Sequence, residues 1–464
     1  MDTKSLLDLA PAEGPKYRRV FGALDKAIRA GHLTAGTKLP TVRALAWDLK
    51  VTPGTVARAY QIATDEGLIE GTVGRGTYVR SQNRMLADVP ENAVVHQGTK
   101  ALLNFRTGHT LDVGQTEVLA DLMREVLAED TLSLAEYVRD DALDACRMLA
   151  SDWLARQGVV GDRSDLVLTY GAHSSVMIAL SAILHGRDPV IASTHLTYPG
   201  FRQSAHLCRA RMIGVDSDDE GIIPDALEAL CRSDRPQVLL ISSHVHNPTC
   251  TVTSPERRRE IARLAQLYDF QIIEDDVYGA MLLDRAEGFD RICPERTWHV
   301  TSLSKCFAAG LRIGFLQCPP GLGGLGIRVM QGMSLAISQI LTKLVEKSFA
   351  SGAVADVQAQ LASENTARVE IARHVLADWD VASLNTVNYV WIEKPHGWTS
   401  STFLSACERE GILVAAGDAF TLPGSPPPHR ARLTLSAARN YDELRAGLEA
   451  VDRIVRNPPR EMLT

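Results

Sequence analysis

One lysine stands where its amine could do covalent chemistry. Lys305 lies in the stretch TSLSKCFAAGLRIGF, and the flanking segments TWHVTSL and LRIGFLQC have the composition of short buried strands. A lysine between buried strands is costly unless a partner neutralises its charge or a reaction uses its amine. Ser302, Ser304 and Arg312 lie nearby in the sequence, and hydroxyls with an arginine fork suit a phosphate. The alternative is a surface turn that happens to contain a lysine and an arginine.

Other polar residues follow predicted strands elsewhere in the chain. Asn247 comes after a strand in HVHNPTC, Asp275 ends a strand in QIIEDDVYG, and Tyr278 lies three residues further on. A lone Asn-Pro turn is common, and an aspartate at such a place can simply cap a helix. Their joint order along the chain is what favours a binding site over separate structural roles.

The elements that must position these residues alternate in type. From residue 165 onward, strand segments such as DLVLTYG, QVLLISSHVHNP and QIIEDDVYG alternate with helical segments such as SPERRREIARLAQLYDF. This rhythm is typical of an α/β domain with a doubly wound, mostly parallel sheet and helices on both faces. Ligands of such sheets bind at the carboxyl ends of the strands. At Gly171, Ala172 and His173 a strand ends and a helix begins, so free backbone N–H groups there form a seat for an anion.

The combined set meets the needs of pyridoxal 5′-phosphate. Its aldehyde needs a lysine, and its ring nitrogen needs a carboxylate to stay protonated and act as an electron sink. Its phenolate oxygen needs neutral donors, and its phosphate needs a helix N-terminus, hydroxyls and an arginine. The residues that fill these positions are Lys305, Asp275, Asn247, Tyr278, Gly171, Ala172, His173, Ser302, Ser304 and Arg312.

Residues from about 104 to 455 resemble the fold-type I aminotransferases. The motifs NP, D-x-x-Y, S-x-S-K and R-x-G appear in the family's order and spacing. The resemblance implies a smaller C-terminal α+β subdomain beside the main sheet. It also implies that Lys305 is the internal aldimine lysine, that Asp275 pairs with the ring nitrogen, and that Asn247 and Tyr278 contact the ring oxygen.

The resemblance extends to three more residues. Tyr198, in HLTYPG, matches the aromatic residue that stacks on the cofactor ring, and Tyr137 matches a tyrosine that reaches the phosphate of the partner subunit. Arg432, in HRARLTLSAA, matches the arginine that grips a substrate carboxylate, although Arg430 and Arg439 are close and a surface salt bridge is its alternative role. The glycine-containing turn that relatives have near Tyr137 is absent here, so transaminase activity is left open.

The front of the chain has a different pattern, that of three short helices and a β-hairpin. The helical segments are YRRVFGALDKAIR, LPTVRALAWDLKV and VTPGTVARAYQIATDEGLI, and GLIEGTVGRGTYV reads as the hairpin. This order predicts a winged helix-turn-helix, whose third helix enters the major groove of DNA. A helical protein-interaction module with a hairpin is the alternative. The candidate DNA-binding residues are Arg43, Thr52, Thr55, Arg58 and Arg75.

About 65 residues of this front region resemble the DNA-binding domain of the GntR family of bacterial regulators. The elements LP, R, LA, TV, AY, GLI and GxGTYV follow one another as they do in that family. At the start of the third helix the chain has Thr52, Pro53 and Gly54, where the family often has arginine or serine. Base preference is therefore not carried over.

Composition divides the chain in the same way. Residues 1–80 hold 12 Lys+Arg and 8 Asp+Glu, whereas the whole chain of 464 residues has a net charge of −7. A basic front on an acidic body indicates that the front faces an anion. We expect a DNA-binding domain over 1–80, a linker over 81–103 and a cofactor domain over 104–464. Eight scattered cysteines without metal-like spacing, and no long apolar run, are typical of a cytoplasmic protein without a metal site or membrane span.

A GntR-type winged helix followed by an aminotransferase-like domain is the arrangement of the MocR subfamily of transcriptional regulators. The resemblance implies a homodimer that binds a double-stranded DNA operator. We expect a pyridoxal-phosphate-dependent regulator that senses an amino compound through aldimine exchange at Lys305. A working aminotransferase with an attached DNA-binding domain, or a regulator that senses pyridoxal phosphate itself, are the alternatives.

Overall fold

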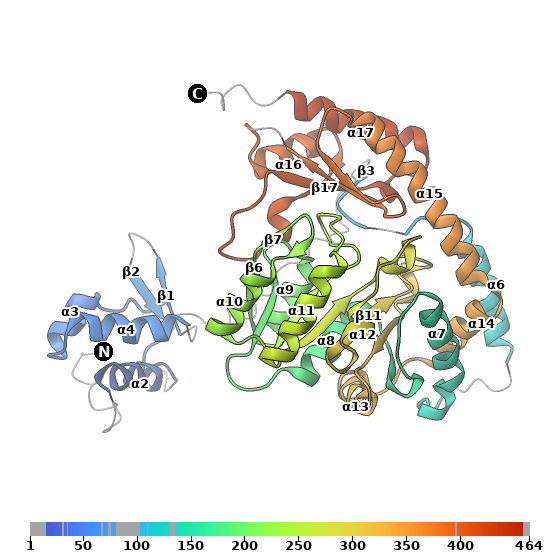
Figure 1. Ribbon diagram of the computed structural model, residues 1–464. Helices are drawn as coiled ribbons and strands as arrows, with labels where there is room; N and C mark the ends of the chain where they lie inside the picture. The colour runs from blue at the N-terminus through green and yellow to red at the C-terminus, as the bar shows by residue number, and fades with distance from the viewer. Residues whose placement is uncertain are drawn as a thin grey trace. The chain divides into compact units, whose positions relative to one another are not determined.

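The computed structural model describes residues 15–29, 32–34, 36–65, 68–72, 76–79, 103–108, 110–129, 135–394 and 397–457. The chain divides into two compact units, Met1–Val89 and Pro90–Thr464, which are described separately (Figure 1). Among the helices of the described residues, none combines the length and the apolar character needed to cross a membrane.

The small unit contains three helices and a hairpin, as the sequence predicts. They are α2 (Lys16–Arg29), α3 (Val42–Asp48), α4 (Pro53–Asp65), β1 (Ile69–Thr72) and β2 (Gly76–Val79). The Thr41 hydroxyl caps α3 by accepting a hydrogen bond from the Ala44 N–H at 3.2 Å, and Pro53 opens α4. The two strands pair antiparallel. One apolar core unites all five elements through Leu24, Leu45, Val56, Tyr60, Ala63, Ile69 and Val79.

The large unit is built on a sheet of seven strands. Its order is β4-β12-β11-β10-β9-β5-β6, and every neighbouring pair is parallel except those that β12 makes. The strands are β4 (Leu166–Thr169), β5 (Val190–Thr194), β6 (Arg211–Val215), β9 (Val238–Ile241), β10 (Gln271–Asp275), β11 (Thr297–Ser302) and β12 (Gly314–Gln317). All residues of β4, β5, β9, β11 and β12 are buried, as expected of strands covered on both faces.

Helices cover both faces of this sheet (Figure 1). Successive residues of β4 show the two sides: Val167 shares an apolar cluster with Val176 of α8, whereas Leu166 and Leu168 cluster with Trp153 of α7. The helices around the sheet are α6 (Gln115–Leu127), α7 (Asp144–Arg156), α8 (Ala172–Ile183), α9 (Pro199–Leu207), α10 (Pro224–Asp234), α11 (Pro255–Tyr268), α12 (Phe289–Ile292), α13 (Gly323–Ser334) and α14 (Gln339–Ala350).

A smaller α+β subdomain follows the sheet domain. Its four-stranded antiparallel sheet has the order β13-β14-β17-β16, with β13 (Val381–Ser383), β14 (Tyr389–Glu393), β16 (Ala415–Ala416) and β17 (Arg430–Thr434). The helices α15 (Ala353–Val375), α16 (Ser400–Arg409) and α17 (Tyr441–Arg456) supply apolar side chains to the same core. Two short strands, β3 (Leu103–Asn104) and β15 (Ile412–Leu413), pair in parallel. This pairing joins the first part of the large unit to its C-terminal subdomain. A two-stranded turn, β7 (Ser217–Asp218) with β8 (Gly221–Ile222), projects from the main sheet domain.

Candidate functional site

One cavity collects most of the residues that the sequence singled out. It opens where strands of the main sheet end, because Lys305 follows β11, Asp275 ends β10 and Asn247 follows β9. The sequence-predicted residues that line it are Ala172, His173, Tyr198, Asn247, Asp275, Tyr278, Ser302, Ser304, Lys305, Arg312 and Arg432. Gly171 lies directly behind the Arg312 guanidinium.

The side-chain amine of Lys305 lies in this cavity and has few interactions with the described residues. Its Nζ donates one hydrogen bond, to the carbonyl of Gly108 at 3.1 Å, and lies 5.6 Å from the centre of the Tyr278 ring. Burial, together with the positive charges of Arg432 and Arg312, lowers the pKa of the Lys305 amine to about 8, although the Asp275 carboxylate opposes this shift. A substantial neutral fraction at physiological pH makes this amine a nucleophile.

Asp275 carries a carboxylate that the described residues do not satisfy. Its Oδ1 atom is buried and has no hydrogen-bond partner among them. Burial raises the pKa of Asp275 to about 7, and the neighbouring Asp276 carboxylate contributes to the rise. A buried, unpaired acceptor costs free energy unless a cation or a donor meets it. The protonated nitrogen of a pyridine ring is such a group, so this observation fits pyridoxal phosphate.

The cavity also contains a seat for an anion. Gly171 precedes α8 with φ +85°, a conformation that glycine adopts without strain, and a Cβ added there would lie 2.8 Å from Nη2 of Arg312. The guanidinium of Arg312 therefore lies against the N-terminus of α8, where backbone N–H groups are free. Burial, helped by Arg312, lowers the pKa of His173, so its imidazole is neutral at pH 7. A phosphate here would meet one fixed positive charge and several neutral donors.

Arg432 reaches the cavity from β17 and is almost fully buried. Its Nη1 donates to Oδ1 of Asn247 at 2.8 Å, and its Nη2 donates to the carbonyl of Arg106 at 2.9 Å. Its Nε is buried without a hydrogen-bond partner among the described residues. Arg430 and Arg439, the neighbours that could have taken its place, instead pair with Asp380 and Glu443.

Some residues stand apart from this arrangement. Tyr137 is 81 % exposed and does not line the cavity of its own chain, so its contact with a partner subunit's phosphate stays a prediction. Conversely, sequence reasoning missed several lining residues, which are Gly108, Val176, Phe201, Ser242, Val245 and Val277. Gly108 approaches closely, since a Cβ there would lie 3.4 Å from Nζ of Lys305. No motif marks these positions, because most are ordinary apolar residues of a strand end or helix.

The predicted DNA-binding side chains are at the surface of the small unit. Arg43, Thr52 and Arg58 are exposed, and Thr55 is half-buried. The Thr52 and Thr55 hydroxyls are 2.9 Å apart and hydrogen-bond each other at the start of α4, while the Arg58 guanidinium lies 4.4 Å from the Tyr17 ring centre. Arg75 lies outside the described residues.

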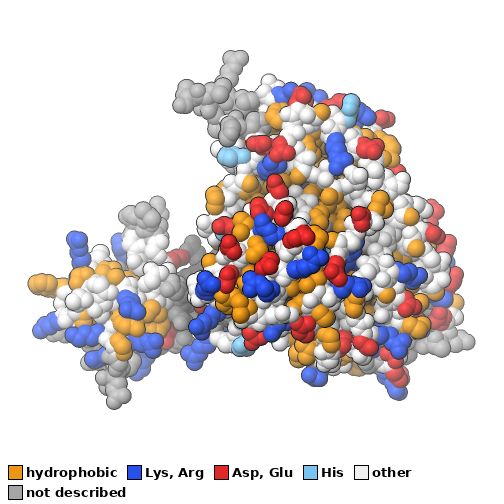
Figure 2. Space-filling model, viewed as in Figure 1, with side chains coloured by type: hydrophobic (Ala, Val, Ile, Leu, Met, Phe, Trp, Pro, Cys, Tyr) orange, Lys and Arg blue, Asp and Glu red, His pale blue; other side chains and the backbone are white. Residues whose placement is uncertain are grey.

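Charge on the small unit suits an anionic partner. On the face that Figure 2 shows, Lys and Arg dominate its charged side chains, whereas the large unit carries both signs. Double-stranded DNA is such a partner, because its phosphates attract clustered basic side chains.

Comparison with known families adds a separate line of evidence. Residues 100–451 match the model of aminotransferase class I and II. The chain belongs to this family. Residues 16–79 match the model of the gntR family of bacterial regulatory proteins. The GntR-type helix-turn-helix in front of a class I/II aminotransferase domain is the arrangement of the MocR subfamily, which confirms the resemblance seen in the sequence.

Individual relatives of this aminotransferase-family chain have the same two-part arrangement or the same fold. The uncharacterized HTH-type transcriptional regulator YdeF of Bacillus subtilis is 25% identical over 446 residues, covering 96% of this chain and 95% of YdeF. The HTH-type transcriptional regulator TauR of Rhodobacter capsulatus is 27% identical, covering 67% and 69%. Among solved structures, Thermus thermophilus LysN, an α-aminoadipate aminotransferase complexed with N-(5′-phosphopyridoxyl)-L-leucine, is 19% identical with a TM-score of 0.70 over 80% of this chain and 96% of LysN.

Proposed function

We propose that this chain is a DNA-binding transcriptional regulator that uses a pyridoxal phosphate site to sense an amino compound. The observation that carries the proposal is the cavity in which the Lys305 amine, the unpaired Asp275 carboxylate and the anion seat at α8 meet, in a chain that begins with a GntR-type domain. We further propose that it works in the cytoplasm as a homodimer, whose two heads suit repeated half-sites on DNA.

The chain's own residues would hold the cofactor at three points. Asp275 would accept a hydrogen bond from the protonated ring nitrogen. The N-terminus of α8 with Arg312 would bind the phosphate, and Lys305 would face the aldehyde carbon. Pyridoxal phosphate supplies an aldehyde that condenses reversibly with amines, so the lysine and an incoming amine can compete for it. The lowered pKa of Lys305, about 8, favours this exchange because the amine released by it can stay neutral.

Arg432 indicates what kind of amine is sensed. Its unpaired buried Nε and its charge point to a ligand carboxylate. We therefore propose an amino acid or a related amino carboxylate as the effector. Regulation requires that this effector binds one arrangement of the protein more tightly than another, since equal affinity would shift nothing.

A second candidate function is a working aminotransferase, and the same Arg432 supports it. Gripping a carboxylate serves turnover as well as sensing, and fold does not separate the two. Sensing of pyridoxal phosphate itself is less well supported. It would need Arg312 at the anion seat but would give no role to the buried Arg432.

The test is a DNA-binding titration with a panel of amino compounds. Fluorescence anisotropy would follow the cofactor-loaded protein on a duplex that the protein itself has selected from a random pool. We expect one class of amino carboxylates to change the affinity at least fivefold in the wild type and in the control Lys347→Ala, whose lysine lies outside the cavity, and to have no effect in Lys305→Ala. An equal response in Lys305→Ala would refute sensing at this lysine. Conversion of a keto acid to an amino acid at a steady rate would favour the aminotransferase.

A further inference from the structure

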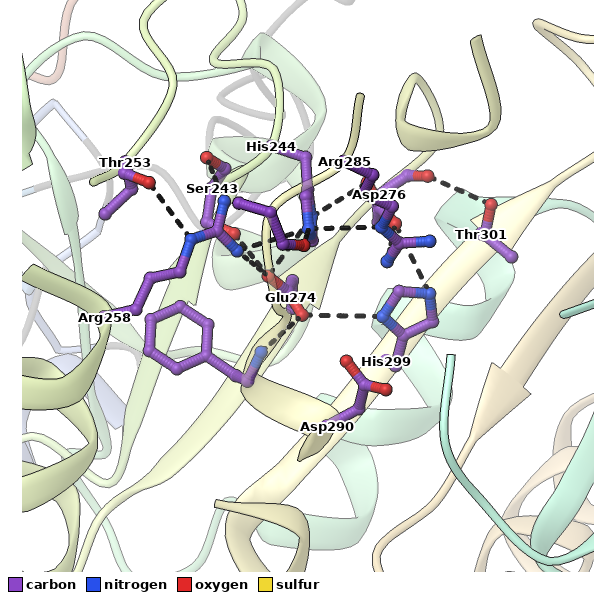
Figure 3. Close-up of polar contacts among 12 residues, drawn as sticks. Ser243, His244, Thr253, Arg258, Glu274, Asp276, Arg285, Asp290, His299 and Thr301 are labelled. Atoms are coloured by element: carbon purple, nitrogen blue, oxygen red, sulfur yellow. Dashed lines mark hydrogen bonds and ion pairs between the residues drawn. The ribbon is translucent and has the colours of Figure 1, made fainter. Parts of the chain in front are cut away.

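A closed ionic network lies behind the Asp275 carboxylate. Glu274 and Asp276 flank Asp275 along the chain, and successive side chains of a strand point to opposite faces, so these two carboxylates point away from the cofactor cavity. They meet side chains from five other segments of the large unit (Figure 3). The titratable and charged members of the network are His244, Arg258, Glu274, Asp276, Arg285, Asp290 and His299.

Each guanidinium in the network is committed to one carboxylate. Nη1 of Arg258 lies 3.3 Å from Oε1 of Glu274, and Nη2 of Arg285 lies 2.6 Å from Oδ2 of Asp276. Arg258 also donates to the carbonyls of Thr253 and Ser243, which fixes its position. These two pairs leave the carboxylate of Asp290 without a cationic partner.

Charge counting therefore shows a deficit within the described part of the chain. Three carboxylates face two guanidinium groups, and Glu274, Asp276 and Asp290 are each at most 3% exposed. An uncompensated negative charge at such depth costs several kcal/mol, so folding favours the uptake of one further positive charge. A proton on one of the network's own groups is the smallest way to supply it.

His299 is the group whose surroundings favour the added proton. Its Nδ1 lies 3.5 Å from Oε2 of Glu274 and its Nε2 lies 3.6 Å from Oδ2 of Asp276, so each ring nitrogen faces a carboxylate (Figure 3). A neutral imidazole has one N–H and would turn a lone pair toward the other carboxylate. With both nitrogens protonated, both contacts become attractive.

The two other candidate positions suit a proton less well. Nε2 of His244 lies 3.1 Å from the Ala286 carbonyl, 3.1 Å from Nε of Arg285 and 3.3 Å from Nη1 of Arg258, so a further positive charge on this ring would face two guanidinium groups. Burial raises the pKa of Asp290, but the charge of His299 and the Val160 N–H, which donates to Asp290 at 2.6 Å, oppose the rise, and a carboxyl starts from a lower ordinary pKa than an imidazole. The network therefore favours His299 over both.

We propose that both ring nitrogens of His299 are protonated at neutral pH, and that the positive charge of this ring balances the buried network and makes His299 a positioning residue for the Asp275 carboxylate. The statement about the proton stands on the network alone, and the statement about Asp275 rests on the proposed function. Burial by itself lowers the pKa of His299, but the carboxylates of Glu274, Asp276 and Asp290 outweigh burial and the opposing charge of Arg285, so the pKa is raised. The charge on His299 in turn lowers the pKa of Asp275, against the effect of Asp276.

A metal ion suits this network less well than a proton. A Cβ added at Gly288 would lie 2.2 Å from Oδ1 of Asp290 and 3.3 Å from Oε2 of Glu274, so the backbone already closes that side of the network. Glu274, Asp290 and His299 together could otherwise reach a metal ion. A divalent cation would also leave one excess positive charge beside the two arginines.

The first test is histidine NMR on the cofactor-free protein, labelled at the Cε1 carbon of its 13 histidines. We expect one resonance to keep the protonated shift to a pH above the ordinary titration range of a histidine and to vanish in His299→Gln. His246→Gln is the matched control, because His246 follows the neighbouring strand β9 but hydrogen-bonds to Thr194 and Thr249, and burial lowers its pKa to about 4. The milder variant Asp290→Asn should turn the His299 resonance neutral at pH 7. A neutral His299 in the wild type, or one equivalent of bound metal by elemental analysis, would overturn the proposal.

The second test uses the cofactor-loaded protein and addresses Asp275. Removing a positive charge behind Asp275 makes the site more negative, so the pH at which the visible band of the bound cofactor changes should rise by ~1 unit in His299→Gln and stay constant in His246→Gln. The same midpoint in all three proteins would refute the positioning role. If the wild type binds no pyridoxal phosphate, the proposed function fails, while the NMR titration still decides the protonation of His299.

Discussion

Replacing Asp275 with asparagine should make the cofactor-free protein more stable and the cofactor less able to stabilise it. Asp275 keeps a buried acceptor unpaired, and burial raises its pKa to about 7. Asparagine has nearly the same shape and carries no charge. It keeps an oxygen for the backbone N–H of Val277 but cannot form an ion pair with a pyridinium nitrogen.

The size of the effect follows from the shift in pKa. A carboxyl with a pKa near 4 in the unfolded chain and about 7 in the folded chain loses stability as the pH rises through this window. Above pH 7 the full penalty is about 4 kcal/mol, and at pH 5 it is about 1.5 kcal/mol. Asp275→Asn removes this penalty, so its gain in the free energy of unfolding should be larger at pH 8 than at pH 5.

Differential scanning calorimetry with and without pyridoxal phosphate measures both parts. Asp276→Asn is a matched control with the opposite expectation, because Asp276 pairs with Arg285 at 2.6 Å and its loss leaves a buried guanidinium unpaired. We expect Asp275→Asn to melt several degrees above the wild type at pH 8 without cofactor and to gain little when it is added. A lower melting temperature than the wild type, or an undiminished gain from the cofactor, would refute the reasoning.

We make three further predictions, two about the cavity and one about the small unit. Gly171→Ala should weaken pyridoxal phosphate binding at least tenfold by equilibrium dialysis, because the residue has φ +85° and its Cβ would meet Arg312, and an unchanged affinity would remove this anion seat from the account. The rate of cofactor binding by stopped flow should be half-maximal near pH 8, the pKa of Lys305, rather than near the ordinary pKa of a lysine, and a midpoint above pH 10 would contradict this. Arg58→Ala should reduce the slope of log affinity for DNA against log salt by ~0.9, and an unchanged slope would mean that Arg58 meets no phosphate.

The sequence indicated, for a topological reason, which residues would share one cavity. Lys305, Asp275 and Asn247 each end or follow a strand, and a parallel sheet brings such ends to one edge whatever the details of packing. The pattern of apolar and polar residues was enough to locate the strands. The three helices and hairpin of the small unit were predicted from local patterns as well, since Pro53 opens α4, whereas the Thr41 cap of α3 emerged only from the structure.

The sequence could not predict contacts between side chains that lie far apart along the chain. The hydrogen bond from Arg432 to Asn247 joins residues 185 positions apart, and no local pattern indicates it. The network around His299 gathers residues from two strands, two loops and two helices, none of which has a motif for it. The exposure of Tyr137 likewise depends on how its loop leaves the sheet domain.

The most direct test of the central claim is the visible absorption spectrum of the purified protein with pyridoxal phosphate, beside that of Lys305→Ala. We expect the wild type to show a band that free cofactor lacks and that amino carboxylates shift. We expect neither feature in Lys305→Ala. Identical spectra in the two proteins, or a band that no amine shifts, would contradict the claim that Lys305 is the residue through which this chain senses amines.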